Sequence, residues 1–237
     1  MPSMNSIHLI MSAYRESDGF GKLIFFSLFG LSILSWAVLI HKTLLLNRVE
    51  KGREGARQKI LKEKEHLLDI GIPNELASPF VALFRSLKGK TKEILEKNHY
   101  FKQGSDAPVY LSRSDMELIE GSVQNSLASQ TKSLEKNLFI LSTVVTVAPF
   151  LGLLGTVWGI LLTFAGLQQG SSLGSSQLIM GGLSTALATT VLGLIIAIPA
   201  LIGYNYLKNR IRELHGEMED FSAELIGTVE LQYRRVE

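Results

Sequence analysis

Apolar residues gather in three long stretches of the chain, separated by segments of mixed charge. Residues 23–46 hold the first stretch, which is uncharged through residue 40. Residues 137–207 contain no Asp, Glu, Lys, Arg or His, and the polar, Gly- and Ser-rich stretch 167–177 divides them in two. A helix that crosses the hydrocarbon core needs about 20 apolar residues. The pattern therefore predicts three transmembrane helices.

The segments between and after these stretches show helical periodicity. Residues 48–68 mix both charges at helical spacing, which is typical of a solvated helix. Ser78-Pro79 has the form of a helix cap followed by proline at the first helical position. An apolar stripe follows at Phe80, Leu83, Phe84 and Leu87. We expect a short helix here, then a loop over residues 98–112.

Two of the membrane helices are expected to continue beyond the bilayer. From Ser114 an apolar stripe leads into the second membrane stretch without a recognisable breaker, so one continuous helix is predicted there. After the third stretch, apolar residues recur three and four apart, a pattern that indicates packing against another helix. These residues are Ile211, Leu214, Met218, Phe221 and Leu225.

Lys and Arg give the orientation. They are scarce in residues 1–22, absent from the 167–177 turn, and frequent just after the first and third stretches. Cytoplasmic loops carry this excess of basic residues. The predicted order is a periplasmic N-terminal segment 1–22, transmembrane helices 23–46, 137–167 and 177–207, a cytoplasmic helical region 47–136, a short periplasmic turn 168–176, and a cytoplasmic C-terminal helix 208–237. The expected location is the bacterial inner membrane.

Composition favours a membrane protein, and the residue types present show no evident enzyme site. Hydrophobic residues make up 46% of the chain and charged residues 19%, whereas soluble domains are nearer a quarter charged. There is no cysteine, and the five histidines are scattered without metal-ligand spacing. No metal site, cofactor or catalytic group is predicted.

Small and hydroxyl residues crowd the second and third membrane stretches. Small residues let membrane helices approach closely, and the glycines predicted to pack are Gly152, Gly155, Gly159 and Gly193. Pro149 and Pro199 are expected to kink their helices. A threonine in a membrane helix commonly bonds to the carbonyl four residues earlier. Several on adjacent helices can instead line a polar seam, here Thr146, Thr156, Thr163, Thr185, Thr189 and Thr190.

These stretches lack a group that can carry a proton. Proton relays in membranes use Asp, Glu, His, Lys or Arg. His41 and Lys42 lie at the inner edge of the first stretch, where both are expected to extend toward water. If the chain conducts protons, the titrating group is expected to come from another polypeptide.

Long ordered motifs in the membrane stretches resemble those of the TolQ/ExbB proton-channel proteins, relatives of the MotA flagellar stator. Residues 148–160 read APFLGLLGTVWGI, residues 185–194 TALATTVLGL and residues 197–200 AIPA. Ser35-Trp36-Ala37 is also similar to TolQ. The resemblance covers nearly the whole chain, and the short N-terminal segment favours TolQ over ExbB.

The resemblance implies an all-α integral membrane protein that forms a homopentamer around a central pore. Inside the pore would lie single helices of a TolR/ExbD-like partner, whose membrane Asp takes and releases protons. By family position, Thr156 and Thr190 would face that Asp. A TolA- or TonB-like protein would carry the work to the outer membrane. Many relatives carry Glu where this chain has Thr185, so no role of that Glu is transferred.

Other functions remain open from the residues alone. A passive channel or transporter would use similar small-residue helices, although transporters usually show internal repeats or broken helices. A purely structural membrane scaffold is also compatible with a hydroxyl seam. A membrane enzyme would need a nucleophile with a base or a metal cluster, and no such arrangement is evident.

Overall fold

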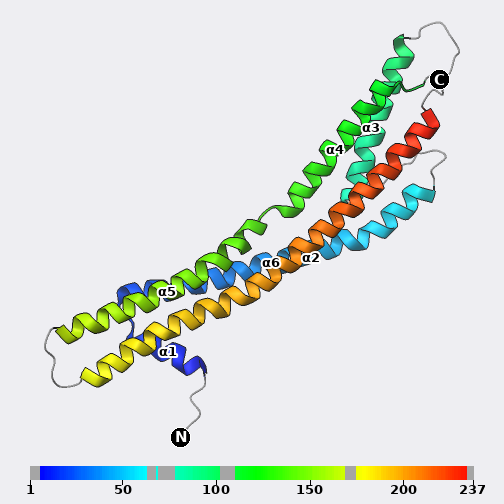
Figure 1. The fold of residues 1–237 in the computed structure, drawn as a ribbon. Coiled ribbons are helices and arrows are strands. Elements are labelled where there is room, and N and C mark those ends of the chain that lie inside the picture. Colours follow the sequence, from blue (N-terminus) through cyan, green and yellow to red (C-terminus); the bar gives the residue numbers. More distant parts are fainter. Residues whose placement is uncertain (1–5, 63–67, 69–77, 102–109, 169–174, 234–237) are drawn as a thin grey trace. The chain divides into compact units, whose positions relative to one another are not determined.

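The computed structural model describes residues 6–62, 68, 78–101, 110–168 and 175–233, and these are nearly all helical (Figure 1). The helices within the described residues are α1 (Ser6–Glu16), α2 (Gly19–Lys62), α3 (Pro79–Phe101), α4 (Arg113–Glu135), α5 (Leu138–Gln168) and α6 (Ser175–Tyr233). Residues 63–67 of the charged stretch 48–68 lie outside the described residues.

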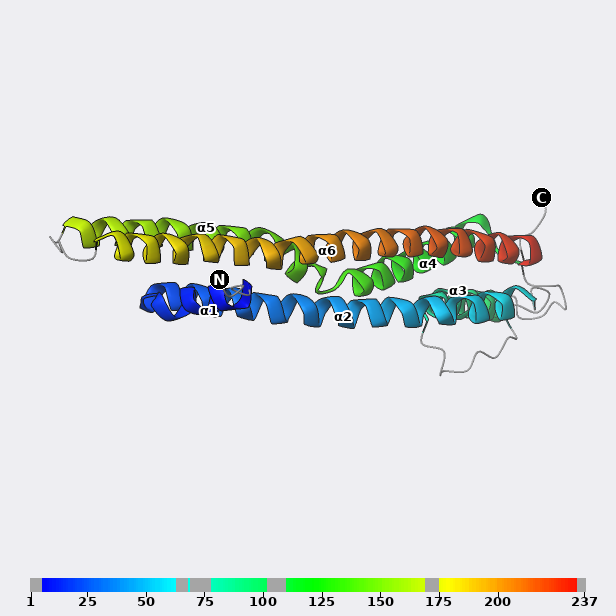
Figure 2. The same cartoon turned by 90° about the horizontal axis from the view of Figure 1, so that it is seen from below.

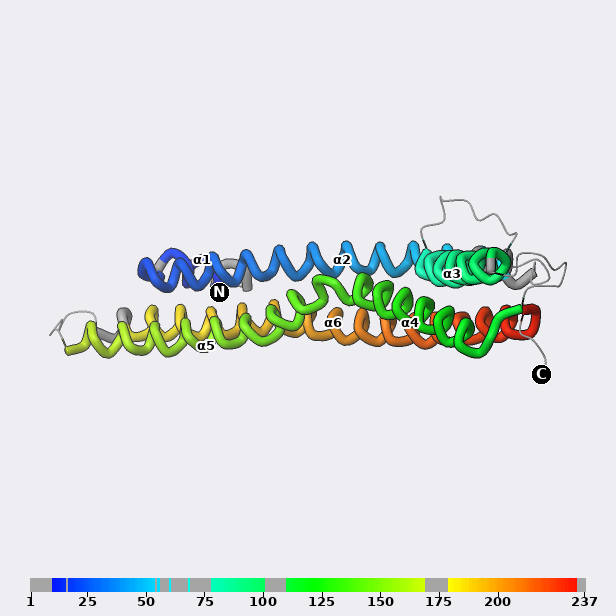
Figure 3. The backbone as a smooth tube through the Cα atoms, turned by 90° about the horizontal axis from the view of Figure 1, so that it is seen from above, coloured from blue at the N-terminus to red at the C-terminus, as the bar shows by residue number. Residues whose placement is uncertain are grey.

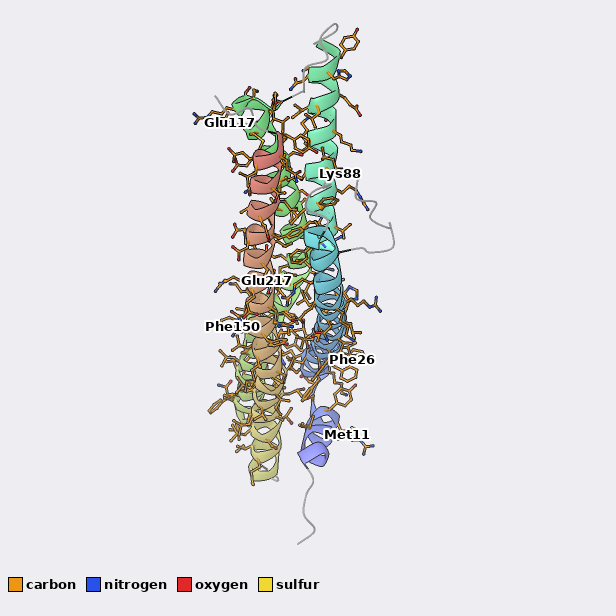
Figure 4. All side chains as sticks on the ribbon, turned by 90° about the vertical axis from the view of Figure 1, so that its right-hand side faces the viewer. Met11, Phe26, Lys88, Glu117, Phe150 and Glu217 are labelled. Atoms are coloured by element: carbon orange, nitrogen blue, oxygen red, sulfur yellow. The ribbon has the colours of Figure 1, made fainter. Side chains whose placement is uncertain are left out.

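Three stretches within the described residues are long and apolar enough to cross a membrane. They are Gly19–Arg53, Arg113–Gln168 and Ile179–Tyr233, of which the second covers both α4 and α5. Large apolar side chains on them remain exposed in the isolated chain, such as Phe26 at 71% and Phe150 at 66% (Figure 4). Exposed apolar surface of this extent suits lipid or neighbouring protein. The chain is therefore consistent with the predicted integral membrane protein.

The described chain divides into two compact units. The first comprises residues 1–42 and 137–207, within which α5 and α6 run side by side (Figures 1 and 2). Its core is apolar and draws on α2, α5 and α6. The buried residues of this core are Ile24, Leu28, Val144, Ala148, Ile196, Ala197 and Ala200.

An N-terminal helix that the hydropathy pattern did not predict joins this unit. Helix α1 precedes α2 by a short turn, and Ala13 is buried. The Tyr14 ring lies edge-on to Phe25 of α2, with ring centroids 5.8 Å apart. The Ser17 hydroxyl donates to the Ala13 carbonyl at the end of α1.

The second unit comprises residues 43–136 and 208–237 and contains α3 and α4 (Figure 3). The predicted stripe on α3 is confirmed, because all four of its residues are at least 98% buried. Phe80 packs against Phe221 of α6 with ring centroids 5.4 Å apart. The predicted stripe at 211–225 of α6 is also buried. Arg53 of α2 pairs with Glu217 of α6 at 2.5 Å, and Glu50 pairs with Arg210.

The prediction of one unbroken helix from Ser114 into the second membrane stretch was wrong. Helix α4 ends at Glu135 and α5 begins at Leu138. Asn137 between them has a φ of 68°. Asparagine is among the few residues that adopt this left-handed conformation readily. The N–H of Lys136 still donates to the Lys132 carbonyl, and that of Ile140 to the Asn137 carbonyl, so the break is compact.

Two local expectations also need correction. Lys42 does not extend toward water, because the residue is only 3% exposed. Residues 98–101 of the expected loop are helical and end α3, while 102–109 lie outside the described residues. The charged 48–68 stretch is helical as predicted through Lys62, where α2 continues into it from the first membrane stretch.

The N-terminal ends of α3 and α4 each follow a serine, but only the serine before α4 caps its helix. Pro79 begins α3 as predicted, but the buried Ser78 hydroxyl has no hydrogen-bond partner among the described residues. Helix α4 instead carries a full capping box. The Asp115 N–H donates to the Ser112 hydroxyl, and the Ser112 N–H donates to the Asp115 carboxylate.

Candidate functional site

The candidate site is the seam between α5 and α6, where the two backbones come close together. A Cβ added at Gly152 would lie 2.9 Å from the Thr189 carbonyl oxygen and 2.9 Å from the Thr190 Cα. One added at Gly193 would lie 2.5 Å from the Ala148 carbonyl oxygen. Because backbone atoms cannot rotate away as side chains do, only glycine fits these two positions without moving a helix.

The other two glycines predicted to pack face side chains across the same seam. A Cβ at Gly155 would lie 2.4 Å from the Thr189 Oγ1, and one at Gly159 would lie 2.8 Å from the Ala186 Cβ. All four predicted packing glycines thus lie against the facing helix. Pro149 lies inside α5 and Pro199 inside α6, and each removes one helical N–H donor.

Thr156 and Thr190 meet across the seam. Their hydroxyls share a hydrogen bond, in which either oxygen can be the donor. Both hydroxyl oxygens also lie 3.0 Å from the Gly152 carbonyl oxygen. Because a hydroxyl has one hydrogen, the threonine that accepts across the seam can donate to that carbonyl. Both residues are half-buried in the isolated chain, so their hydroxyls lie at the edge of the seam. The structure therefore brings together the two threonines that the family resemblance selects.

Thr189 lies deeper in the same group. It is only 2% exposed, and its hydroxyl donates to the Ala186 carbonyl at 2.7 Å and the Gly152 carbonyl at 3.2 Å. Three threonine hydroxyls therefore converge on the single carbonyl of Gly152. This cluster of Thr156, Thr189 and Thr190 is called the threonine cluster below.

The remaining threonines predicted to line the pore lie apart from this cluster. Thr146 is exposed, and its hydroxyl donates to the Ser142 carbonyl at 2.8 Å. The Thr163 hydroxyl donates to the Gly159 carbonyl at 2.8 Å and lies beside Gly182. Both follow the common bonding of a membrane threonine to its own helix. Thr185 is half-buried on α6, one turn before Thr189.

The chemistry of the cluster is limited to hydrogen bonding. A hydroxyl donates one hydrogen bond and accepts others, but it does not ionise near neutral pH. The sequence has no Asp, Glu, His, Lys or Arg from Asn137 to Leu207. Among the residues that the structure describes, no group of three or more His, Asp or Glu suits a metal ion. The cluster can orient water or a carboxyl group but cannot itself store a proton.

A second feature of this unit, the side chain of Asp18, was not predicted from the sequence. Asp18 caps α2 through the N–H of Gly21 at 2.9 Å, and its Oδ2 accepts from the Trp158 indole N–H at 3.1 Å. The Phe20 ring lies 4.6 Å from that of Trp158. Partial burial raises the pKa of Asp18, but the Gly21 and Trp158 hydrogen bonds outweigh it and leave the pKa below 3.8. In the sequence, the cap could have been recognised from an Asp that immediately precedes an apolar helix.

Comparison with known proteins gives consistent matches. The family model described as the MotA/TolQ/ExbB proton channel family matches residues 91–220. A biopolymer transport protein ExbB of Aquifex aeolicus is 46% identical over 99 residues, which are 39% of this chain and 66% of that protein. ExbB of Neisseria meningitidis is 26% identical over 82% of this chain and 85% of its own. The Tol-Pal system protein TolQ of Haemophilus influenzae is 28% identical over 84% of each chain.

Proposed function

The chain belongs to the MotA/TolQ/ExbB proton channel family, and we propose that it forms the wall of a proton path in an inner-membrane motor. Its three long apolar helices and its ExbB and TolQ relatives support a multi-pass inner-membrane protein. The proposed role is a stator subunit that converts the proton motive force into work at the outer membrane. No catalytic reaction is proposed for it.

The observation that carries the proposal is the threonine cluster in a charge-free seam. A buried charge at the bilayer centre costs roughly 2.5–3.5 kcal/mol on insertion scales, and this chain places none in residues 137–207. The half-buried Thr156 and Thr190 hydroxyls can donate hydrogen bonds to a carboxylate that reaches the seam. Hydrogen bonds to the charged form stabilise that form.

We propose that this carboxylate is a membrane Asp of a TolR/ExbD-like single-span partner. When the Asp is ionised, the Thr156 and Thr190 hydroxyls donate to it. When it is protonated, the same hydroxyls can accept from it, because a hydroxyl serves in both roles. The proton is thus held by the partner, while this chain supplies the path and the matching hydrogen bonds.

The assembly around this path is part of the same proposal. A homopentamer would enclose the partner helices, and a TolA- or TonB-like protein would transmit the work. The N-terminus would be periplasmic and the C-terminus cytoplasmic, as the distribution of Lys and Arg favours. Native mass spectrometry of the co-expressed complex counts the copies: five of this chain with one or two partners support the proposal, and any other stable ratio contradicts it.

The direct test replaces the two hydroxyls with methyl groups. Thr156→Val and Thr190→Val preserve side-chain shape but remove the donors that would face the partner's Asp. We expect each variant to assemble with the partner and lose proton-driven function. Thr143→Val is the matched control, because within the described part of the chain the Thr143 hydroxyl bonds only to the Phe139 carbonyl of its own helix. Function retained in both seam variants would favour a passive channel or a structural scaffold.

A further inference from the structure

A cavity in the second unit has features that the proton path does not use. It has a volume of about 340 Å³ and lies between α2, α3 and α4. Leu45, Val49 and Leu134 contribute apolar walls, and Ser78, Arg85 and Gln130 contribute polar groups. None of these residues lies on the α5–α6 seam, so a ligand in this cavity would not depend on the proposed proton path.

The polar side of the cavity contains an unused donor. Ser78 precedes α3 and is only 6% exposed, yet its Oγ has no hydrogen-bond partner among the described residues. A serine at this position usually accepts from an N–H of the first helical turn. Buried hydroxyls in folded proteins are nearly always hydrogen-bonded. An orphan hydroxyl on the wall of a cavity therefore indicates a ligand with a polar atom.

The charge around this hydroxyl favours an anion. Helix α3 is 23 residues long, and its first N–H groups have no partner within the helix. Those groups and the helix dipole make its N-terminus positive. Arg85 adds a guanidinium to the same cavity, and the described lining residues include no Asp or Glu. A phosphate group suits this combination of donors.

The apolar side of the cavity favours a lipid over a soluble anion. Leu45 belongs to the last turn of the predicted first membrane helix, and α2 continues from it without a break. Leu134 lies one turn before Leu138, where α5 begins. The α2 and α4 walls of the cavity are therefore helical turns next to two predicted membrane spans, and α3 supplies the third wall. A molecule with a phosphate and an acyl chain matches both sides.

We propose that this cavity binds one anionic phospholipid of the adjoining leaflet. Its phosphate accepts hydrogen bonds from the Ser78 hydroxyl, the first N–H groups of α3 and the Arg85 guanidinium. One acyl chain lies against Leu45 and Val49. This lipid fills the space between α2, α3 and α4 and ties these helices to the membrane surface.

The test measures lipid retention by the full chain in detergent. Native mass spectrometry follows binding of added phosphatidylglycerol, with phosphatidylcholine as the zwitterionic lipid and inorganic phosphate as the soluble source of the same chemistry. Arg85→Gln removes the guanidinium, Ser78→Ala removes the orphan hydroxyl, and Ala82→Leu fills the cavity without changing charge. Arg113→Gln is the matched control, because that arginine is 88% exposed on α4 and does not line the cavity.

We expect one tightly retained phosphatidylglycerol per chain. Its affinity should fall about tenfold or more in Arg85→Gln and about fivefold in Ser78→Ala, in line with charged and neutral hydrogen bonds. Ala82→Leu should abolish retention, and Arg113→Gln should leave it unchanged. Equal retention in all variants would overturn the proposal. Displacement of the lipid by inorganic phosphate would assign the site to a soluble anion instead, and an Ala82→Leu variant that loses only its oligomeric state would assign it to a neighbouring copy.

Discussion

At the scale of single residues, the close packing of α5 against α6 depends on glycines, because glycine has no side chain to separate the two backbones. Gly193 places its Cα against the Ala148 carbonyl, so an added Cβ would lie 2.5 Å from that oxygen. We expect Gly193→Ala to lower the free energy of unfolding by about 1–3 kcal/mol, the usual range for overpacking. Thermal unfolding of the detergent-solubilised protein measures this change.

Gly166 provides the control for this substitution. It lies on α5, and nothing is within 4 Å of an added Cβ. Since alanine is favoured over glycine inside a helix by roughly 1 kcal/mol, Gly166→Ala should be neutral or stabilising. If both alanine variants unfold at the same temperature as the wild type, Gly193 is not required for the close approach of α5 and α6, which would contradict this prediction.

Asp18 is the residue for which a pH dependence is expected. Its pKa in the folded chain is lowered from 3.8. The hydrogen bonds that the ionised Asp18 accepts from the Gly21 N–H and the Trp158 indole N–H therefore stabilise the fold at pH values above the ordinary pKa. This contribution is lost as the pH falls through the lower pKa of the folded chain. Tryptophan fluorescence of a Trp36→Phe variant isolates Trp158 and should change on strong acidification. Asp18→Asn should abolish this change, and a persistent change would assign it to another group.

The site was only partly predictable at this scale. The hydroxyl seam followed from residue types, but the choice of Thr156 and Thr190 came from resemblance, since spacing alone does not say which threonines meet. Thr189 shows why: it is adjacent to Thr190 but is almost fully buried, while Thr190 stays at the seam's edge. Asp18 and Trp158 lie far apart in sequence, and only the packing of α2 beside α5 joins them.

At the scale of elements, the junction between α4 and α5 depends on one backbone conformation. Asn137 has a φ of 68° and is exposed. The residue type at this position should therefore affect stability mainly through the backbone conformation that it can adopt. We expect Asn137→Val to destabilise the fold by about 1–2 kcal/mol, the cost of the left-handed conformation for a residue with a Cβ. Asn137→Gly should not destabilise it. Thermal unfolding distinguishes the two.

Lys136 supplies the matched position for this experiment. It is also exposed, but its φ is −50°, which β-branched residues adopt freely. Lys136→Val should therefore leave stability nearly unchanged. Equal losses at both positions would show that valine disturbs the junction for reasons other than the sign of φ.

Helices with a clear apolar period were predicted well, and their ends less so. The stripes on α3, α4 and α6 are buried as the three- and four-residue spacing requires. It was harder to predict where a helix continues. Helix α2, for example, passes from an apolar stretch into a charged one without ending. Conversely, the α4–α5 break occurs at a single asparagine within an otherwise regular pattern. Local sequence gives the period, whereas tertiary packing decides where a helix bends or continues.

At the scale of the whole molecule, charged side chains are separated along the sequence from the charge-free region 137–207, as expected for a membrane channel protein. Asp, Glu, His, Lys and Arg are absent from residues 137–207 and frequent in the regions before and after. The described helices that carry the charge-free region pack through glycines and hydroxyls. A proton path built from the α5–α6 seam alone would lack a side chain that titrates near neutral pH. The proposed path therefore requires two polypeptides, one for the wall and one for the titrating carboxyl.

The most direct test of this requirement is proton flux into liposomes under an imposed membrane potential. Three preparations are compared: this chain alone, this chain with its single-span partner, and the same complex with the partner's membrane Asp replaced by Asn. We expect only the complex with an intact Asp to conduct protons. Conduction at the same rate by this chain alone, or by the Asn complex, would contradict it, because the chain would then carry protons without the carboxyl that it lacks.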